Sequence, residues 1–431
     1  MSKLDEQDFD ERRLERRKRR KRNQFIAYIV FIIIIVLLVG AIGTSIHFIH
    51  GAIVSRRRAI DAAEKLTKGV EEQPENIVIE TPENSTDVEE YTQEEAMTDI
   101  VEKVIGDMTI EDKVAGLFII NPEQITGVET AVKAGSGTQE ALSKYAVGGI
   151  VYSPKNIKSA DQIKEMLVST ASMSKFPLFT ILSDKALYND QVIETLGLSL
   201  QEEITDEDTA HSAGATIGST LFKYGFNMAM FPANDISENG KFGSDAESVK
   251  LRATAFATGL QQSGVSACGY AFPVMGSSDG DVNVSDKTRD DLVVGEFEVF
   301  KNAIDSKAMN AIRMSELSLP QLSGDDTPST LSGTVIGEEL KGTLGYEGIV
   351  ITAPLGDIAI SEKYSSAEAA VAAIMAGADM IYLPGDFTEA YEGILQNISE
   401  GRITEERINE SIRKIMGIKY SDQVSQISTS N

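Results

Sequence analysis

The hydrophobic pattern divides the chain into one long apolar segment and a longer region of short, regularly spaced apolar runs. Residues 25–49, FIAYIVFIIIIVLLVGAIGTSIHFI, contain no charged side chain. At about 1.5 Å of rise per residue, a helix of this length crosses a hydrocarbon core of about 30 Å. It lacks the polar stripe that a helix packed on a soluble core carries. The pattern therefore predicts one transmembrane helix over residues 24–54.

The flanking residues predict how this helix is oriented. Residues 12–22, RRLERRKRRKR, precede the apolar segment and are expected to stay cytoplasmic. A cleaved signal peptide has a shorter apolar region of about 7–15 residues, which favours an uncleaved anchor. Residues 1–23 are then a basic cytoplasmic tail, which either only sets the topology or also contacts anionic lipid headgroups. The predicted location is the cell membrane, with the rest of the chain extracytoplasmic.

After the membrane segment the chain changes character twice. Residues 55–97 are acidic and show little periodicity, which predicts a flexible stalk. Residues 98–420 predict one folded domain, and residues 421–431 a disordered tail. The domain contains eight short apolar runs: AGLFII at 115–120, GGIVYS at 148–153, LFTILS at 178–183, NMAMFPA at 227–233, VSACGYAF at 265–272, AMNAIRMS at 308–315, GIVITAP at 348–354 and MIYLPG at 380–385.

The segments between these runs carry helical spacing, as in residues 159–173, 245–264 and 366–378. Near-continuous apolar strands that alternate with helices indicate a parallel sheet buried on both faces. Eight such units in one domain predict an α/β fold, a (β/α)8 TIM-like barrel. An open doubly wound sheet is the alternative. No glycine-rich phosphate loop follows any strand, so no nucleotide cofactor is predicted.

Charge and composition narrow the classes of partner. The net charge is −26, and residues 1–23 hold ten basic against six acidic side chains, so the remainder carries −30. Such an acidic body repels phosphate backbones and argues against nucleic-acid binding. One cysteine and three histidines exclude an intramolecular disulfide framework and a zinc-finger-type cluster. The sequence predicts neither a metal nor any other cofactor.

Several stretches, in order, resemble the N-terminal barrel domain of family 3 glycoside hydrolases, particularly the bacterial β-N-acetylhexosaminidases. They are MTIEDKVAGLFII at 108–120, YGFNMAMFPANDI at 224–236, FGSDAESVKLRATAFATGLQQSGV at 242–265 and TPSTLSGTVIGEELKGTLGYEGIVIT at 327–352. The similarity extends over roughly residues 100–420. It implies a sugar-cleaving barrel that forms a glycosyl-enzyme on an aspartate.

The residues that carry the family's chemistry depart from its pattern. The family strand ending VVITD delivers the nucleophile, and here Thr352 is followed by Ala353. A methyl group can neither attack the anomeric carbon nor stabilise positive charge on it. Asp357, four residues further on, is a weak substitute because its carboxylate is expected to point elsewhere.

The general acid/base also lacks its counterpart. The family uses an Asp-His pair on the loop after the fifth strand, and an ungapped reading places Asp281 and Asn283 there. A shifted reading places Ser285 and Lys287 on the pair instead. Asn cannot exchange a proton near neutral pH, and Lys would need a pKa lowered by several units. His211, in a helical stretch, is expected to be a surface or packing residue. The family's sugar-binding Lys-His pair corresponds to Tyr270 and Ala271.

Three carboxylates remain as candidate ligand-binding residues: Asp184, Asp235 and Asp281. Each could instead bond loop amides. Leu187 and Tyr188 stand where the family has glycines and are expected to crowd the sugar site.

These observations predict a membrane-anchored, catalytically silent barrel that binds a cell-wall glycan or an extracytoplasmic protein. An active β-N-acetylhexosaminidase and a purely structural domain are the alternatives.

Overall fold

The computed structural model describes residues 93–198, 204–237, 240–275 and 284–428. The eight strands are β1 Phe118–Ile120, β2 Gly149–Tyr152, β3 Phe179–Leu182, β4 Met228–Ala229, β5 Ser266–Phe272, β6 Ala311–Met314, β7 Ile349–Pro354 and β8 Met380–Tyr382. They form a closed barrel in the order β1 to β8, and every neighbouring pair is parallel. The barrel closes where Phe118 and Ile119 of β1 pair with Ile381 and Tyr382 of β8. The (β/α)8 prediction is confirmed, and the open sheet is excluded.

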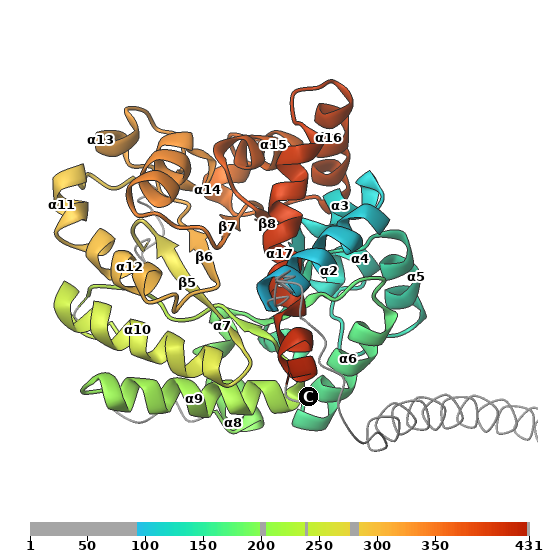
Figure 1. Cartoon of the computed structure of the whole chain (residues 1–431), viewed down its shortest axis with the longest axis horizontal. Coiled ribbons are helices and arrows are strands. Elements are labelled where there is room, and N and C mark those ends of the chain that lie inside the picture. The colour runs from blue at the N-terminus through green and yellow to red at the C-terminus, as the bar shows by residue number, and fades with distance from the viewer. Residues whose placement is uncertain (1–92, 199–203, 238–239, 276–283, 429–431) are drawn as a thin grey trace, which may run out of the picture. The chain divides into compact units, whose positions relative to one another are not determined.

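Helices surround the strands, as Figure 1 shows. The longer ones are α2 Gln93–Asp107, α5 Ser136–Lys144, α6 Ala160–Met173, α9 Glu207–Tyr224, α10 Ala246–Gln262, α12 Glu296–Asp305, the π-helix η3 Thr334–Thr343, α15 Ser366–Ala376, α16 Phe387–Ser399 and α17 Glu405–Ser428. Shorter helical turns are α3 Ile110–Gly116, α4 Pro122–Thr126, η1 Pro154–Asn156, α7 Asp184–Leu187, α8 Asp190–Leu196, α11 Arg289–Val293, α13 Pro320–Ser323, η2 Ser329–Leu331 and α14 Ile358–Ser361.

Local sequence signals fix where these helices start and stop. Asp245 caps α10 by accepting a hydrogen bond from the Ser248 amide, and Ser365 forms a capping box with Glu368 at the start of α15. Helix α15 ends at Gly377, whose φ of 111° is a backbone conformation that glycine adopts readily. The predicted helices at 159–173, 245–264 and 366–378 are present, shorter by one to a few residues at their ends.

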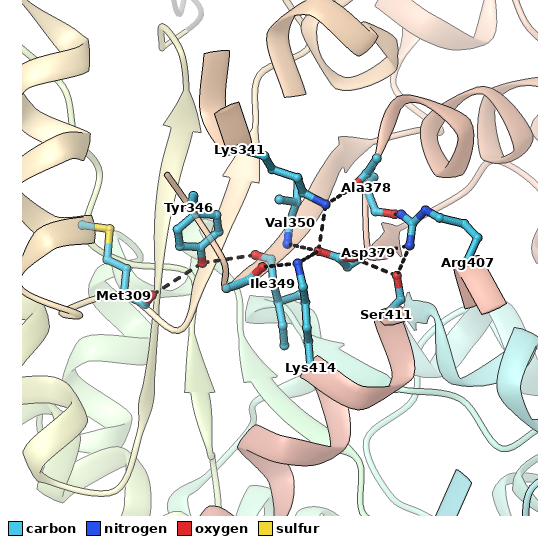
Figure 2. A network of polar contacts seen from close by, with 12 residues as sticks. Met309, Lys341, Tyr346, Ile349, Val350, Ala378, Asp379, Arg407, Ser411 and Lys414 are labelled. Atoms are coloured by element: carbon cyan, nitrogen blue, oxygen red, sulfur yellow. Dashed lines mark hydrogen bonds and ion pairs between the residues drawn. The ribbon is translucent and has the colours of Figure 1, made fainter. Parts of the chain in front are cut away.

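Helix α17 crosses the face of the barrel where the strands begin. The buried carboxylate of Asp379 holds it there through hydrogen bonds and ion pairs. Asp379, which immediately precedes β8, is 1% exposed and lies among Lys341, Arg407 and Lys414 (Figure 2). Its oxygens accept hydrogen bonds from the Ser411 hydroxyl at 2.8 Å, the Val350 amide at 3.0 Å and Lys414 Nζ at 3.2 Å.

The same cations also satisfy backbone carbonyls at this face. Lys341 donates to Gly377 O at 2.6 Å, Arg407 to Ala378 O at 2.6 Å, and Lys414 to Gly348 O at 3.1 Å. The Asp379 network therefore joins α17 and η3 to the beginnings of β7 and β8.

Within the described residues, no helix combines the length and the apolarity needed to cross a bilayer. The predicted transmembrane segment at 24–54 lies outside those residues.

Candidate functional site

A cavity of about 1070 Å³ lies at the opposite face, where the strands end. It is lined by the ends of β2, β5, β6, β7 and β8 and by the loops that follow several of the strands. The lining residues are Asn121, Val151, Ser153, Lys155, Ser183, Asp184, Lys185, Asp235, Ser237, Tyr270, Ala271, Met275, Arg313, Glu316, Pro354, Asp357, Tyr382 and Leu383. Active sites of such barrels sit at this end, because the loops there converge on one space. We refer to it as the mouth cavity.

An ion pair lies in the wall of the mouth cavity. Arg313, on β6, donates from Nη2 to Asp184 Oδ2 at 3.1 Å. Oδ1 of the same carboxylate accepts from the Lys185 amide at 2.8 Å, because Asp184 opens the short helix α7. Arg313 is 8% exposed, whereas the Asp184 side chain is 21% exposed. Asp184 therefore bonds an amide in the first turn of its own helix and also neutralises a buried cation.

Two tyrosine rings flank this guanidinium. The centroid of Tyr270 is 4.4 Å from Arg313 Cζ, and that of Tyr382 is 5.7 Å away. Burial alone would lower the pKa of Arg313. The charge of Asp184 and the two tyrosines have the opposite effect and outweigh burial, so the pKa lies above its ordinary value. Burial raises the pKa of Tyr382 and of Tyr270 well above the usual range, so both phenols are neutral donors.

The remaining charged residues sit around the cavity rather than in a tight cluster. Asp235 accepts a hydrogen bond from Ser237 Oγ at 2.7 Å, and Lys155 pairs with Glu123 at 3.5 Å. Glu316 follows β6, and Asp357 follows β7 as the residue before α14. Asp357 lies on the cavity wall, which is closer to the site than the sequence indicated.

The end of β7 carries no carboxylate. Ala353 is fully buried, and its amide donates to Thr330 Oγ1 at 2.9 Å. The next residue, Pro354, reaches the cavity wall. Strand β7 therefore ends in a methyl group packed in the hydrophobic core, which cannot act as a nucleophile.

The expectation that Leu187 crowds the site is wrong, whereas Tyr188 shares a hydrogen bond with the Tyr270 side chain of the cavity wall. Ser183 caps α7, and the resulting helical turn places Leu187 in the core at 1% exposure. Tyr188 is half exposed and packs beside Phe231, with ring centroids 6.0 Å apart. Neither residue lines the mouth cavity, which stays open to a ligand.

The candidate acid/base positions are separated from this cavity or undescribed. Lys287 forms an ion pair with buried Glu296 and does not line the cavity. Asp281 and Asn283 lie outside the described residues. His211 lies on α9, and its Nε2 contacts Gln262 Oε1 of α10 at 2.9 Å, away from the cavity. The structure thus brings Asp184 and Asp235 to one cavity and leaves Lys287 out of it.

A model of the glycosyl hydrolase family 3 N terminal domain matches residues 109–418. The chain belongs to glycosyl hydrolase family 3. A β-hexosaminidase from Haemophilus influenzae is 23% identical over 293 residues, which cover 62% of this chain and 79% of that protein. A β-hexosaminidase from Alkalilimnicola ehrlichii is 24% identical over 275 residues, with 59% and 78% coverage.

Solved structures agree with this assignment. A family 3 β-N-acetylglucosaminidase from Paenibacillus sp. superposes with a TM-score of 0.65 at 27% identity, covering 74% of this chain and 63% of that one. A β-N-acetylhexosaminidase from Beutenbergia cavernae gives a TM-score of 0.63 at 22% identity, with 73% and 99% coverage. The second likeness shows the shared fold.

Sequence reasoning missed the central residue of this family 3 mouth. Arg313 stands in the apolar run AMNAIRMS, where one charged residue inside a barrel strand must either face the mouth or be paired. That signal was present in the sequence. Its partner was not readable, because Asp184 is 129 residues away and meets it only through barrel closure.

Proposed function

We propose that this family 3 chain is a catalytically silent glycan-binding protein, anchored in the cell membrane through residues 24–54 with its barrel extracytoplasmic. The observation that carries the proposal is the pairing of an open mouth cavity with a buried alanine at the end of β7. Retaining glycosidases need a nucleophilic carboxylate about 5–5.5 Å from the acid/base, and Ala353 supplies none. A cell-wall glycan is the proposed ligand, because the relatives named above are β-hexosaminidases.

The alternative is an active β-N-acetylhexosaminidase. It is favoured by one observation, that Glu316 and Asp357 both line the mouth cavity. Two carboxylates at a barrel mouth are the groups that an inverting or retaining mechanism uses.

One assay separates the two functions. Purified full-length protein is incubated with a chromogenic N-acetylglucosaminide beside its Asp357→Asn and Glu316→Gln variants. We expect no turnover above that of a denatured sample. Turnover that either variant abolishes would establish the hydrolase instead.

Binding is measured on the same preparation. Isothermal titration with chito-oligosaccharides and peptidoglycan fragments is expected to give saturable binding that Asp184→Ala weakens. If the folded protein binds no saccharide, its mouth cavity is not a glycan site.

The membrane part of the proposal rests on the sequence and has its own test. Cell fractionation is expected to place the protein in the membrane pellet. External protease should digest the barrel while it spares a tag placed before residue 1. A soluble pool, or cleavage of that tag, would contradict the predicted topology.

A further inference from the structure

Arg313 retains hydrogen-bonding capacity that the protein does not use. A guanidinium carries five N–H groups, and Nη2 donates one of them to Asp184. Nε is buried and has no acceptor among the residues that the structure describes. Nε itself is too deeply buried for a ligand to reach, but Arg313 lines the mouth cavity and 10% of its side chain is exposed. The exposed edge of the guanidinium can therefore donate to an acceptor that enters the cavity.

The guanidinium is also held in place before any ligand arrives. Tyr270 lies 4.4 Å from it and Tyr382 5.7 Å, while Asp184 fixes one edge of its plane. A side chain that is already immobile loses little conformational entropy on binding. The same Asp184 carboxylate is partly exposed to the cavity, so it can accept from a ligand hydroxyl beside the donor.

Charge in the cavity decides the class of ligand. The ion pair is neutral overall, and the described lining residues comprise three cations and four carboxylates. A ligand carrying its own carboxylate would enter a space with a slight excess of negative charge. A neutral ligand rich in hydroxyl and amide groups matches the adjacent donor and acceptor without that penalty.

We propose that Arg313 determines the specificity of the mouth cavity. Together with Asp184 it binds a neutral saccharide, donating to a carbonyl or ring oxygen while Asp184 accepts from a hydroxyl. This inference rests on the proposed glycan-binding function. It adds which residue determines specificity and that the preferred saccharide is uncharged.

The test compares two saccharides on the full-length protein by isothermal titration. The neutral probe is N,N′-diacetylchitobiose, and the acidic probe is the disaccharide of N-acetylglucosamine and N-acetylmuramic acid, which carries one carboxylate. We expect the neutral probe to bind at least 10-fold more tightly. Arg313→Met should weaken its binding at least 10-fold, and Arg313→Lys should recover part of the loss by restoring the charge without the planar fork.

Arg413→Met serves as the matched control, because this arginine is exposed on α17 and pairs with Glu102 and Glu406. It should bind both probes as the unaltered protein does. Thermal unfolding of every variant shows whether the fold is kept, and Arg313→Lys decides the question if Arg313→Met unfolds.

The possible results distinguish failure of the glycan-binding function from failure of the role of Arg313. If the unaltered protein binds neither probe, the glycan-binding function fails, and this inference falls with it. If it binds the neutral probe and both Arg313 variants bind equally well, only the role of Arg313 is overturned. Tighter, Arg313-dependent binding of the acidic probe would overturn the charge selectivity alone.

Discussion

The two ends of the barrel each bury a charged group with partners of opposite sign, and the two clusters are built differently. At the end where strands begin, Asp379 is surrounded by three cations and two neutral donors, and these cations also bond backbone carbonyls. At the other end, Arg313 has one carboxylate partner, two aromatic rings and a buried N–H without an acceptor in the described residues. The first cluster is saturated, and the second is not.

The difference indicates that the Asp379 end of the barrel serves stability and the Arg313 end serves ligand binding. A saturated cluster holds elements together, as the Asp379 network holds α17, because every group has its partner before anything else binds. An unsaturated cluster beside a large cavity has donors left for a ligand. This agrees with the usual division of such barrels into a stability face and a functional face.

The largest expected effect is from Asp379→Asn, which would strip three cations of their shared carboxylate. Removing one partner of a buried charge cluster typically costs 3–5 kcal/mol, so the free energy of unfolding should fall by about that amount. Denaturant unfolding measures it, and saccharide binding should survive wherever the variant is folded. Arg413→Met, which breaks only exposed pairs on the same helix, is the control and should change stability by less than about 0.5 kcal/mol. Equal effects of the two changes would remove the distinction between the Asp379 network and an ordinary surface pair.

A smaller effect is expected at Lys419 on α17, a cation with no carboxylate partner among the described residues. Its Nζ is buried without a described partner, 4.8 Å from the Phe179 ring centroid, and burial lowers its pKa to about 7. Between about pH 7 and the unperturbed value of 10.5, the unfolded chain holds a proton that the folded chain has released. The free energy of unfolding should therefore rise with pH through this window.

Lys419→Met should remove the Lys419 part of that rise. Below pH 7 it should stabilise the protein by about 2 kcal/mol, because an unpaired buried charge is replaced by an apolar chain. Denaturant titrations at pH 6 and pH 10 test this. Lys341, whose pKa burial lowers to about 8, contributes a similar slope that should persist in the variant. A variant with an unchanged pH slope would show that Lys419 is solvated.

The smallest expected change in stability is from Asp184→Asn at the mouth. Its carboxylate is partly exposed, so water can replace part of its contact with Arg313, and we expect a loss of about 1 kcal/mol. Affinity for the neutral disaccharide should fall about 10-fold, because the charged acceptor is gone. A stability loss as large as that of Asp379→Asn, without loss of binding, would make the mouth pair a structural one.

Much of the fold could be read from the sequence, because buried parallel strands are short apolar runs. All eight predicted runs contain a strand, although β4 is only Met228–Ala229 within the run at 227–233. The apolar runs are longer than the strands because apolar residues beyond a strand still pack in the core, as Phe231 does. Hydrophobicity reports burial, whereas strand limits depend on hydrogen bonding between neighbours.

The site was readable only in part. Asp184 and Asp235 were found through their motifs, and both line the mouth cavity. The direction of Leu187 was not readable, because a single helical turn after Ser183 decides which side it faces. The two tyrosine rings that flank the guanidinium were not readable either. Tyr270, Arg313 and Tyr382 come from β5, β6 and β8, so their contacts depend on the register of the closed barrel.

Helix α2 packs against α17, and Arg413 of α17 bonds Glu102 of α2. The first described helix is thus bonded to α17, the helix that the Asp379 network holds at the end of the barrel where the strands begin.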